Sequence, residues 1–241
     1  MKALKWLGVV LFAYVAVLAS GVVDDKSTNE KRAGINAAAL APEIEFTKIN
    51  ETGDLAPEAS RYRLDASRSK FIARALAGGL LWFKGHDHLI AVREFTGEAI
   101  LDPDSLTASS LQISAKTASM EETSSIFTDA QKKIINRELR EIVLLPDQYP
   151  EIVFKSTNVT GKASGAGQYD LKIKGDLTLN GVTRPITIPT KATVSGDDLR
   201  AQGEFSIDRS DFKVKATSAF HGLVRVSNKV KFEFDIVGHR F

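Results

Sequence analysis

Two histidines, His86 and His88, stand two positions apart in the stretch GHDHLI. Residues i and i+2 of a β-strand share a face, so both imidazoles could reach one metal ion or one polar head group. The aspartate between them would face the other way, toward solvent or into a turn. A zinc site needs further ligands, and only His221, His239 and acidic residues remain to supply them. Hydrogen-bonded turn residues are therefore the main alternative to a metal or head-group site.

The sequence carries no recognisable catalytic motif. It contains no cysteine, which excludes disulfides, thiolate catalysis and cysteine-ligated metals. No Gly-x-Ser-x-Gly elbow or His-Glu-x-x-His motif occurs, and no spacing singles out a Ser/His/Asp triad. Glu121 and Glu122 are adjacent just before a predicted helix, where a solvated or capping pair is expected. The sequence thus predicts a protein that is not an enzyme and that uses no cofactor.

The elements that must position the histidines are predicted to be β-strands. The clearest signal is the strict alternation of Tyr169, Leu171, Ile173, Leu177 and Leu179 with polar residues, which indicates a half-buried strand. The residues that follow, an Asn-Gly pair, favour a tight hairpin turn, because both central positions of that turn adopt positive φ. Similar patterns predict strands over 61–65, 70–76, 80–85, 89–101, 106–118, 152–160, 168–179, 183–194, 199–206 and 224–237.

Strands of this number and length predict an all-β fold. About eight or more strands, each with one apolar face, need a closed barrel or a sandwich to bury that face. Their length favours an antiparallel eight-stranded barrel, which we place at residues 61–241. The spacing changes over residues 128–143, where apolar residues recur at helical intervals and Thr128 with Gln131 forms a capping box. This segment predicts one α-helix that closes an end of the barrel and acts as a lid or wall.

Residues 1–23 are interpreted as a signal peptide or an N-terminal anchor. Lys2 and Lys5 precede an uncharged apolar run, and small residues up to Ala19 suit signal peptidase. The run has about 18 residues, which is also the lower limit for a membrane span. We therefore expect a periplasmic or secreted protein, held to the membrane if the segment is not cleaved. Residues 24–60 show no sustained period and are predicted to be a linker.

Charge argues against a nucleic-acid partner. Removal of residues 1–19 would leave 30 Lys and Arg against 30 Asp and Glu, so the mature chain is near neutral. Opposite charges alternate on the predicted outer faces, whereas a nucleic-acid site needs a basic groove with exposed aromatic side chains.

Strand parity assigns a set of mostly apolar side chains to the barrel interior. The candidate ligand-binding residues are Phe95, Ile113, Phe154, Leu171, Ile173, Ile188, Ala201, Phe205, Phe232 and Phe234, with His86 and His88 at the mouth. Small residues also face inward and are expected to leave volume unfilled: Ala99, Ala115, Gly175, Ala192, Ala201 and Gly203. A barrel of this size is either filled by its own side chains or just wide enough for one ligand, and the pattern alone leaves both open.

Four motifs resemble the YceI-like family in sequence, order and spacing. They are YPEIVFKST at 149–157, GDLTL at 175–179, NGVT at 180–183 and RSDF at 209–212. The likeness extends over about residues 61–240. The GHDH stretch and Lys213-Val214, which stands where the family usually has Gly-Ile, indicate a divergent branch. The resemblance implies an extended, lipocalin-like barrel that holds a polyisoprenoid chain, in a protein typically exported to the periplasm.

We therefore expect an exported carrier for a polyisoprenoid or similar amphiphilic lipid, which could contact a membrane transiently. The competing interpretation is a metal-binding or redox accessory protein that uses His86 and His88. A barrel filled by its own side chains, serving only as an interaction module, is a third. The oligomeric state does not follow from the sequence.

Overall fold

The computed structural model describes residues 59–78, 85–216, 218–219 and 224–241. The expected signal peptide or anchor at 1–23, the linker up to residue 58 and nearly all of the predicted strand 80–85 lie outside these residues. Among the described residues, no helix is both long enough and apolar enough to cross a membrane.

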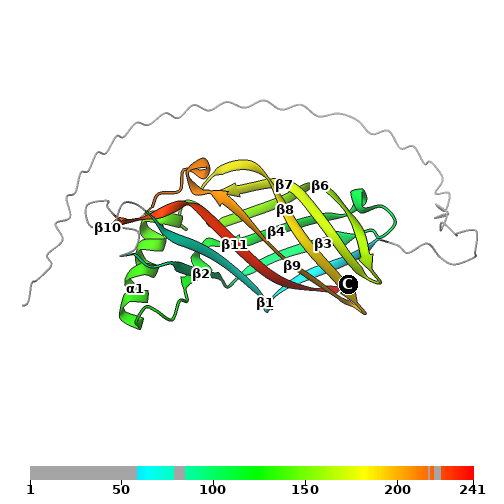
Figure 1. Ribbon diagram of the computed structural model, residues 1–241, viewed down its shortest axis with the longest axis horizontal. Coiled ribbons are helices and arrows are strands. Elements are labelled where there is room, and N and C mark those ends of the chain that lie inside the picture. Colours follow the sequence, from blue (N-terminus) through cyan, green and yellow to red (C-terminus); the bar gives the residue numbers. More distant parts are fainter. Residues whose placement is uncertain (1–58, 79–84, 217, 220–223) are drawn as a thin grey trace, which may run out of the picture. The chain divides into compact units, whose positions relative to one another are not determined.

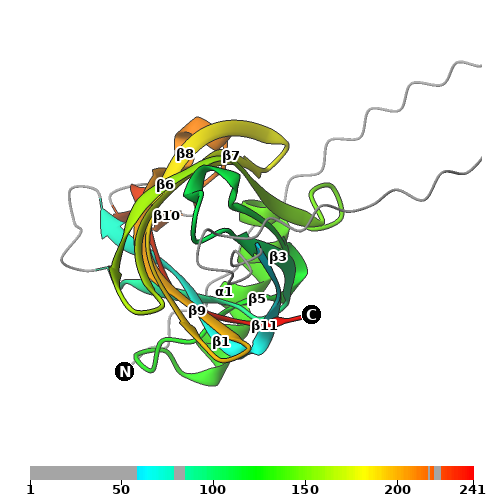
Figure 2. The same cartoon turned by 90° about the vertical axis from the view of Figure 1, so that its right-hand side faces the viewer.

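Eight antiparallel strands close into a barrel, as the sequence predicted (Figures 1 and 2). In spatial order they are β1 (Ser60–Gly78), β3 (Phe95–Leu101), β4 (Ser110–Lys116), β6 (Glu151–Gly165), β7 (Gln168–Leu179), β8 (Val182–Ser195), β9 (Asp198–Asp208) and β11 (Val224–Arg240). The ring closes where β11 pairs with β1, from Tyr62 opposite Arg240 to Gly78 opposite Arg225. Closure gives every strand of the ring two neighbours, and the alternating side chains bury their apolar face inside.

The strands β6 to β9 form a meander that is regular apart from two register shifts between β6 and β7. Each pairs with the next along the chain, and β7 has the bounds predicted for it. The turn between β7 and β8 has positive φ at Asn180 (51°) and Gly181 (70°), which confirms the predicted hairpin.

The strand β1 is continuous, so the prediction of two short strands at 61–65 and 70–76 was wrong. Pairing with β11 jumps from Asp65 opposite Val237 to Lys70 opposite Asp235, which marks a large bulge. The bulge is held by side chains: Asp65 Oδ1 accepts from the amide of Ser67 at 2.8 Å, and Ser69 Oγ accepts from the amide of Val237 at 2.9 Å. Inward residues change from even to odd numbers across it.

The predicted strand 89–101 is broken into two. The short strand β2 (His88–Val92) pairs with residues 72–75 of β1, whereas β3 pairs with residues 60–63 of the same strand. Glu94 lies at the break, and its backbone oxygen accepts from the amide of Lys116 at 3.0 Å. On its free side β2 pairs with β5 (Met120–Glu122).

Two further differences from the predicted strands concern where one strand begins and an additional short strand. The predicted strand 106–118 begins only at Ser110, because Leu106–Ala108 form a 3-10 helix. A two-residue strand, β10 (Ser218–Ala219), pairs with the start of β11.

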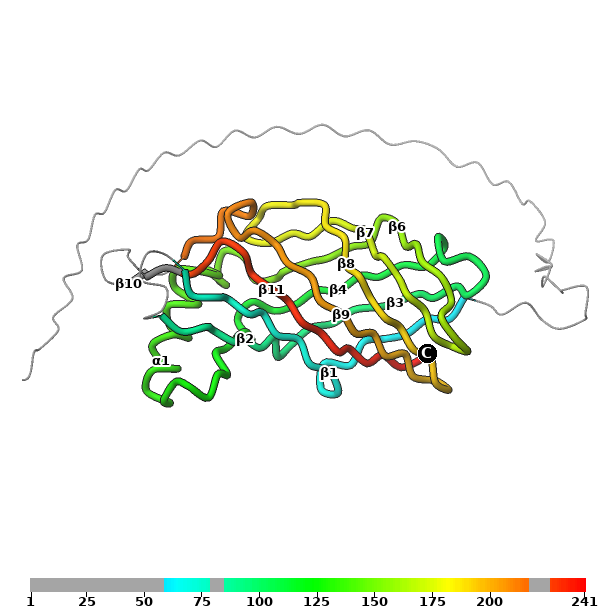
Figure 3. Tube along the Cα trace, viewed as in Figure 1, coloured from blue at the N-terminus to red at the C-terminus, as the bar shows by residue number. Residues whose placement is uncertain are grey.

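The predicted helix is α1 (Asp129–Glu138), which continues as a π-helix over Leu139–Leu144. The capping box at Thr128 is confirmed, since its side chain accepts from the amide of Gln131 and the Gln131 side chain accepts from the amide of Thr128. The predicted apolar stripe is only partly buried, since Ile134 is 50% exposed whereas Leu139 is buried. The helix lies at the same end of the barrel as β2, away from the C-terminus (Figure 3).

Candidate functional site

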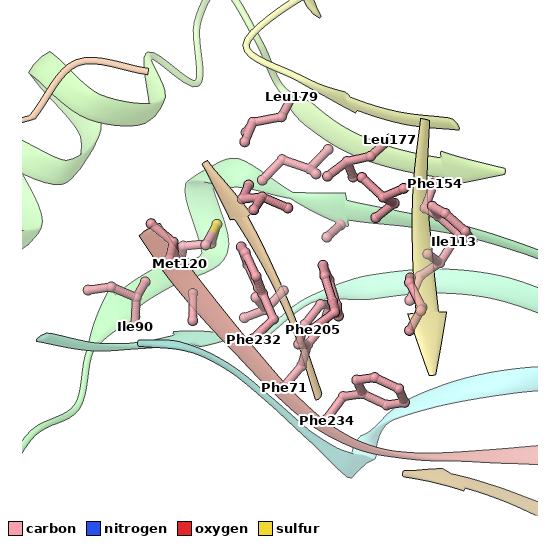
Figure 4. A pocket seen from close by; sticks show the side chains of 18 of the residues that line it. Phe71, Ile90, Ile113, Met120, Phe154, Leu177, Leu179, Phe205, Phe232 and Phe234 are labelled. Carbon is pink, nitrogen blue, oxygen red and sulfur yellow. The ribbon is translucent and has the colours of Figure 1, made fainter. Parts of the chain in front are cut away.

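The barrel encloses a cavity of about 480 Å³, within the usual range of ligand sites. Its lining is mostly apolar and comes from β-strands around the ring together with α1 and the π-helix. Side chains from facing strands point into this space (Figure 4). The predicted role of the helix as a wall is confirmed, because Ile135, Leu139 and Val143 line the cavity.

Four phenylalanines form an aromatic cluster on one side of the cavity. The rings of Phe205 and Phe232 stack with centroids 4.9 Å apart, and Phe234 lies 6.4 Å from Phe205. Phe71 of β1 completes the cluster, at 6.1 Å from Phe232. Phe71 was not among the interior residues predicted from the sequence. The signal that could have identified it is the alternation of Phe71, Ala73, Ala75 and Ala77, all of which line the cavity.

Most of the predicted interior residues line the cavity. These are Ile113, Phe154, Leu171, Ile173, Ile188, Ala201, Phe205, Phe232 and Phe234, together with His86 and His88. Phe95 is the exception. It is buried, but it packs edge-on against Phe71 at 6.4 Å, within a second core cluster that includes Met120 and Leu139. Phe95 is therefore covered by its neighbours in this cluster and does not reach the cavity.

The inward glycines do not leave empty volume, contrary to expectation. A Cβ built on Gly175 would lie 2.6 Å from the ring of Phe154, and one on Gly203 would lie 2.7 Å from the ring of Phe234. The aromatic rings therefore occupy the space above both glycines. Of the small residues predicted to face inward, those that line the cavity are the alanines at positions 99, 115, 192 and 201.

Glu122 was expected to be a solvated or capping residue together with Glu121, but it is buried. Its neighbour Glu121 is partly exposed and pairs with Arg93 at 2.8 Å, as a solvated residue would. The Glu122 side chain, in contrast, has no exposed surface, and its Oε2 lies 2.8 Å from Nδ1 of His88. Adjacent residues of β5 point to opposite sides, and only pairing with β2 brings the inward one to His88. No local signal in the sequence identifies this pair.

The carboxyl of Glu122 is held in its charged form. Burial alone would raise its pKa, but the hydrogen bonds from His88 and from the amides of Ser124 and Leu89 outweigh burial and leave the pKa lowered. The amide of Glu122 in turn donates to Asn136 Oδ1 at 2.7 Å, which fastens β5 to α1.

The two histidines both contact Phe127 but differ in their surroundings. The ring of His88 stacks on Phe127 at 5.2 Å, whereas the ring of His86 meets it edge-on at 5.9 Å and is exposed. The aspartate between them, Asp87, accepts from the amide of Ala77 at 3.1 Å. This agrees with the expected turn role.

Among the described residues, no group of three or more His, Asp or Glu side chains has a geometry that could hold a metal ion. His239 was a possible third ligand, but it pairs with Arg63 near the start of β1. His88 pairs with Ala75, near the other end of the same strand. His239 bonds Asp198 and Arg68 instead. His221 lies outside the described residues.

The RSDF motif forms a 3-10 helix, Arg209–Phe212, beside the cavity. The guanidinium of Arg209 donates to the backbone oxygens of Val214 at 2.9 Å and Ser227 at 3.2 Å, which fixes the entry to β11. Phe212 is almost fully buried. Lys213 follows in a left-handed conformation with φ 55°, a geometry that favours glycine. A glycine at this position would adopt the same φ without strain.

Comparison with solved structures supports the fold. The Burkholderia cenocepacia protein BcnA has a TM-score of 0.57 at 22% identity, over 72% of this chain and 98% of that one. A polyisoprenoid binding domain from Saccharophagus degradans, implicated in plant cell wall breakdown, has a TM-score of 0.52 at 11% identity, over 76% of this chain and all of that one. At these identities the likeness shows the fold alone.

Sequence relatives point to one family. A UPF0312 protein of Vibrio cholerae is 33% identical over 105 residues, 44% of this chain and 50% of that protein. Protein YceI of Escherichia coli is 32% identical over 144 residues, 57% of this chain and 66% of that protein. The chain thus spans about half to two thirds of the length of these relatives. The sequence model of the YceI-like domain matches residues 62–238, which is nearly the whole barrel, and the chain therefore belongs to the YceI-like family.

Proposed function

We propose that this protein is a carrier that holds a polyisoprenoid or similar amphiphilic lipid inside its barrel. The observation that carries the proposal is the apolar cavity of about 480 Å³, walled by the aromatic cluster and by aliphatic side chains of the meander. Burial of an apolar tail contributes about 25 cal/mol per Å² removed from water. A long tail can therefore be held with few polar contacts.

Its fold relatives support the class of ligand. The Saccharophagus degradans domain, which shares the barrel, is a polyisoprenoid binding domain. The YceI-like family is a family of binding proteins, and we propose that this member likewise performs no chemistry on its ligand.

We further propose that the protein acts outside the cytoplasm, in the periplasm or as a secreted protein. The apolar run within residues 1–23, preceded by Lys2 and Lys5, supports export. A carrier of this kind would exchange its ligand with a membrane, so a transient membrane contact is part of the proposal.

Native mass spectrometry of the exported protein, purified from its own host without detergent, tests the proposal. We expect a mass excess that is lost on extraction with organic solvent and that fragments as isoprene units. A protein that stays at its apo mass when polyprenyl alcohols and other single-chain amphiphiles are added would overturn the carrier function.

Two phenylalanine variants of β9 localise the ligand. Ala201 lines the cavity, so Ala201→Phe should fill it and abolish uptake. Ser206 of the same strand is exposed, so Ser206→Phe adds the same ring outside the barrel and should leave uptake unchanged. Equal uptake by both variants would place the ligand elsewhere.

A further inference from the structure

A hydrogen-bonded polar pair, His88 and Glu122, stands at the wall of this mostly apolar cavity. Glu122 Oε1 accepts from the amides of Ser124 at 2.8 Å and Leu89 at 3.1 Å, and its Oε2 bonds Nδ1 of His88 at 2.8 Å. Both carboxylate oxygens are therefore satisfied, although the side chain is wholly buried. A buried carboxylate is a costly way to stabilise a fold, even when it is fully hydrogen-bonded, since apolar residues of similar volume usually do as well. Its presence at the cavity suggests a task other than stability.

The pair fixes the orientation of the His88 ring. An ionised carboxylate only accepts hydrogen bonds, so Nδ1 of His88 must carry the proton that it shares with Glu122. The stacked ring of Phe127, tilted by only 16°, holds the plane of the imidazole. A neutral imidazole held in this way has its lone pair on Nε2, on the far side of the ring from Glu122.

The accessible part of the pair belongs to the cavity. His88 lines the cavity and its side chain is 24% exposed, whereas Glu122 does not line it. Among the described residues, Nε2 of His88 has no hydrogen-bond partner. An oriented acceptor is therefore available at a cavity whose lining is mostly apolar.

Several other polar groups of the lining are already engaged in hydrogen bonds or are at least partly exposed. Ser109 Oγ accepts from the amide of Asp102 at 2.9 Å, and the guanidinium of Arg209 is bound to backbone oxygens. Lys215 and Glu138 also reach the cavity, but Lys215 is exposed and Glu138 is partly exposed, so neither is held in place as His88 is.

We propose that Nε2 of His88 binds the head group of the carried amphiphile, that this head group is a hydroxyl, and that Glu122 is the positioning residue. A hydroxyl can donate to the lone pair of Nε2, and it can also accept from a protonated ring. An ether of the same tail can only accept, and a plain hydrocarbon can do neither. This inference rests on the proposed carrier function and names the ligand class, an isoprenoid alcohol or phenol.

The test is a competition between matched ligands at pH 8, above the range in which imidazoles usually titrate. Geranylgeraniol, its methyl ether and the corresponding hydrocarbon are offered to the delipidated full-length protein, and the bound fractions are measured by native mass spectrometry. We expect the alcohol to bind roughly three- to tenfold more tightly than the ether, as one additional hydrogen bond implies. A geranylgeranyl phenol distinguishes a phenolic from an aliphatic hydroxyl source.

Variants assign the preference to the pair. His88→Phe should bind the ether as the wild type does and lose the preference for the alcohol. His239→Phe makes the same exchange at the far end of β1, outside the cavity lining, and should keep the preference. Glu122→Gln should reduce the preference while ether binding persists, because the ring is no longer held by a carboxylate.

Nitrogen NMR of the wild-type protein provides a readout that does not depend on the folding of any variant. The His88 ring should show a protonated Nδ1, and its Nε2 signal should move on addition of the alcohol but not of the ether. Equal affinity for alcohol and ether, or an unchanged Nε2 signal, would overturn the head-group site and leave the carrier function standing. Failure to bind even the hydrocarbon and the ether would refute the carrier function, and the head-group site with it.

Discussion

The two halves of the barrel wall are built in different ways. The meander β6 to β9 consists of long strands joined by tight hairpins, and its inner face is aliphatic and aromatic. The wall from β1 to β5 contains a large bulge, a broken strand and a short extra ladder covered by α1 and the π-helix. The His88–Glu122 pair lies in this second half.

The difference shows what irregularity makes possible. In a regular strand every inward position faces the same apolar interior, so a charged side chain there would be unpaired. The short strand β5 ends at Glu122, and there the backbone amides of Leu89 and Ser124 bond the buried carboxylate. We infer that the regular half supplies the apolar wall and the irregular half the polar contact.

The largest expected effect comes from truncating Leu139, which packs the π-helix against β5 and β3. Leu139→Ala should lower the free energy of unfolding by about 2–5 kcal/mol, since it removes a buried side chain and leaves a void. Hydrogen exchange should accelerate in α1, β2 and β5 while β6 to β9 stay protected. Uniform loss of protection would mean that the two halves unfold as one unit and do not differ in the way described.

A glycine tests the packing of the regular half. Gly175→Ala would place a Cβ 2.4 Å from the backbone oxygen of Lys155 and against the ring of Phe154. We expect a loss of about 1–3 kcal/mol in urea unfolding, as is usual for overpacking. Gly165→Ala is the control, because its Cβ would meet side-chain atoms only at 3.5 Å or beyond. An equal effect at both positions would contradict the tight packing of Phe154 over Gly175.

Glu122 predicts a pH dependence in the irregular half. Its folded-state pKa is lowered, so its stabilising contribution is complete above its usual pKa, about 4.3, and is lost as the pH falls through the folded value. Glu122→Gln should therefore cost most stability at pH 7 and progressively less below pH 4.3. Urea unfolding at pH 7 and at pH 3.5 measures this difference, with Glu121→Gln as the exposed control. A cost that is the same at both pH values would show that the charge of Glu122 is not what matters.

The smallest expected effect is a gain. Lys213 adopts φ 55°, so Lys213→Gly should relieve backbone strain and stabilise the protein by about 0.5–1 kcal/mol. Lys213 directly follows the 3-10 helix Arg209–Phe212 and does not line the cavity, so ligand uptake should not change. Thermal unfolding measures the shift, and a decrease in the midpoint would indicate that the lysine side chain contributes more than its backbone costs.

The regular half was predictable because its signals are local. Alternation over residues 168–179 defines a strand whatever its partner is, and Asn180-Gly181 defines the turn. Antiparallel order and closure follow once each strand has one apolar face to bury. The same reasoning placed nine of the ten predicted apolar interior residues on the cavity lining, while their contact with a ligand remains a prediction.

Tertiary structure decided what depends on distant partners. Residues 61–65 and 70–76 become one strand only because β11 pairs with both across the bulge, and Phe95 is packed against Phe71 and does not line the cavity. Glu122 looks like any surface glutamate until β2, 34 residues earlier in the chain, brings His88 to it. Alternation states which side of a strand a residue occupies, but only the packed neighbours determine whether that side is water, a phenylalanine ring or a cavity.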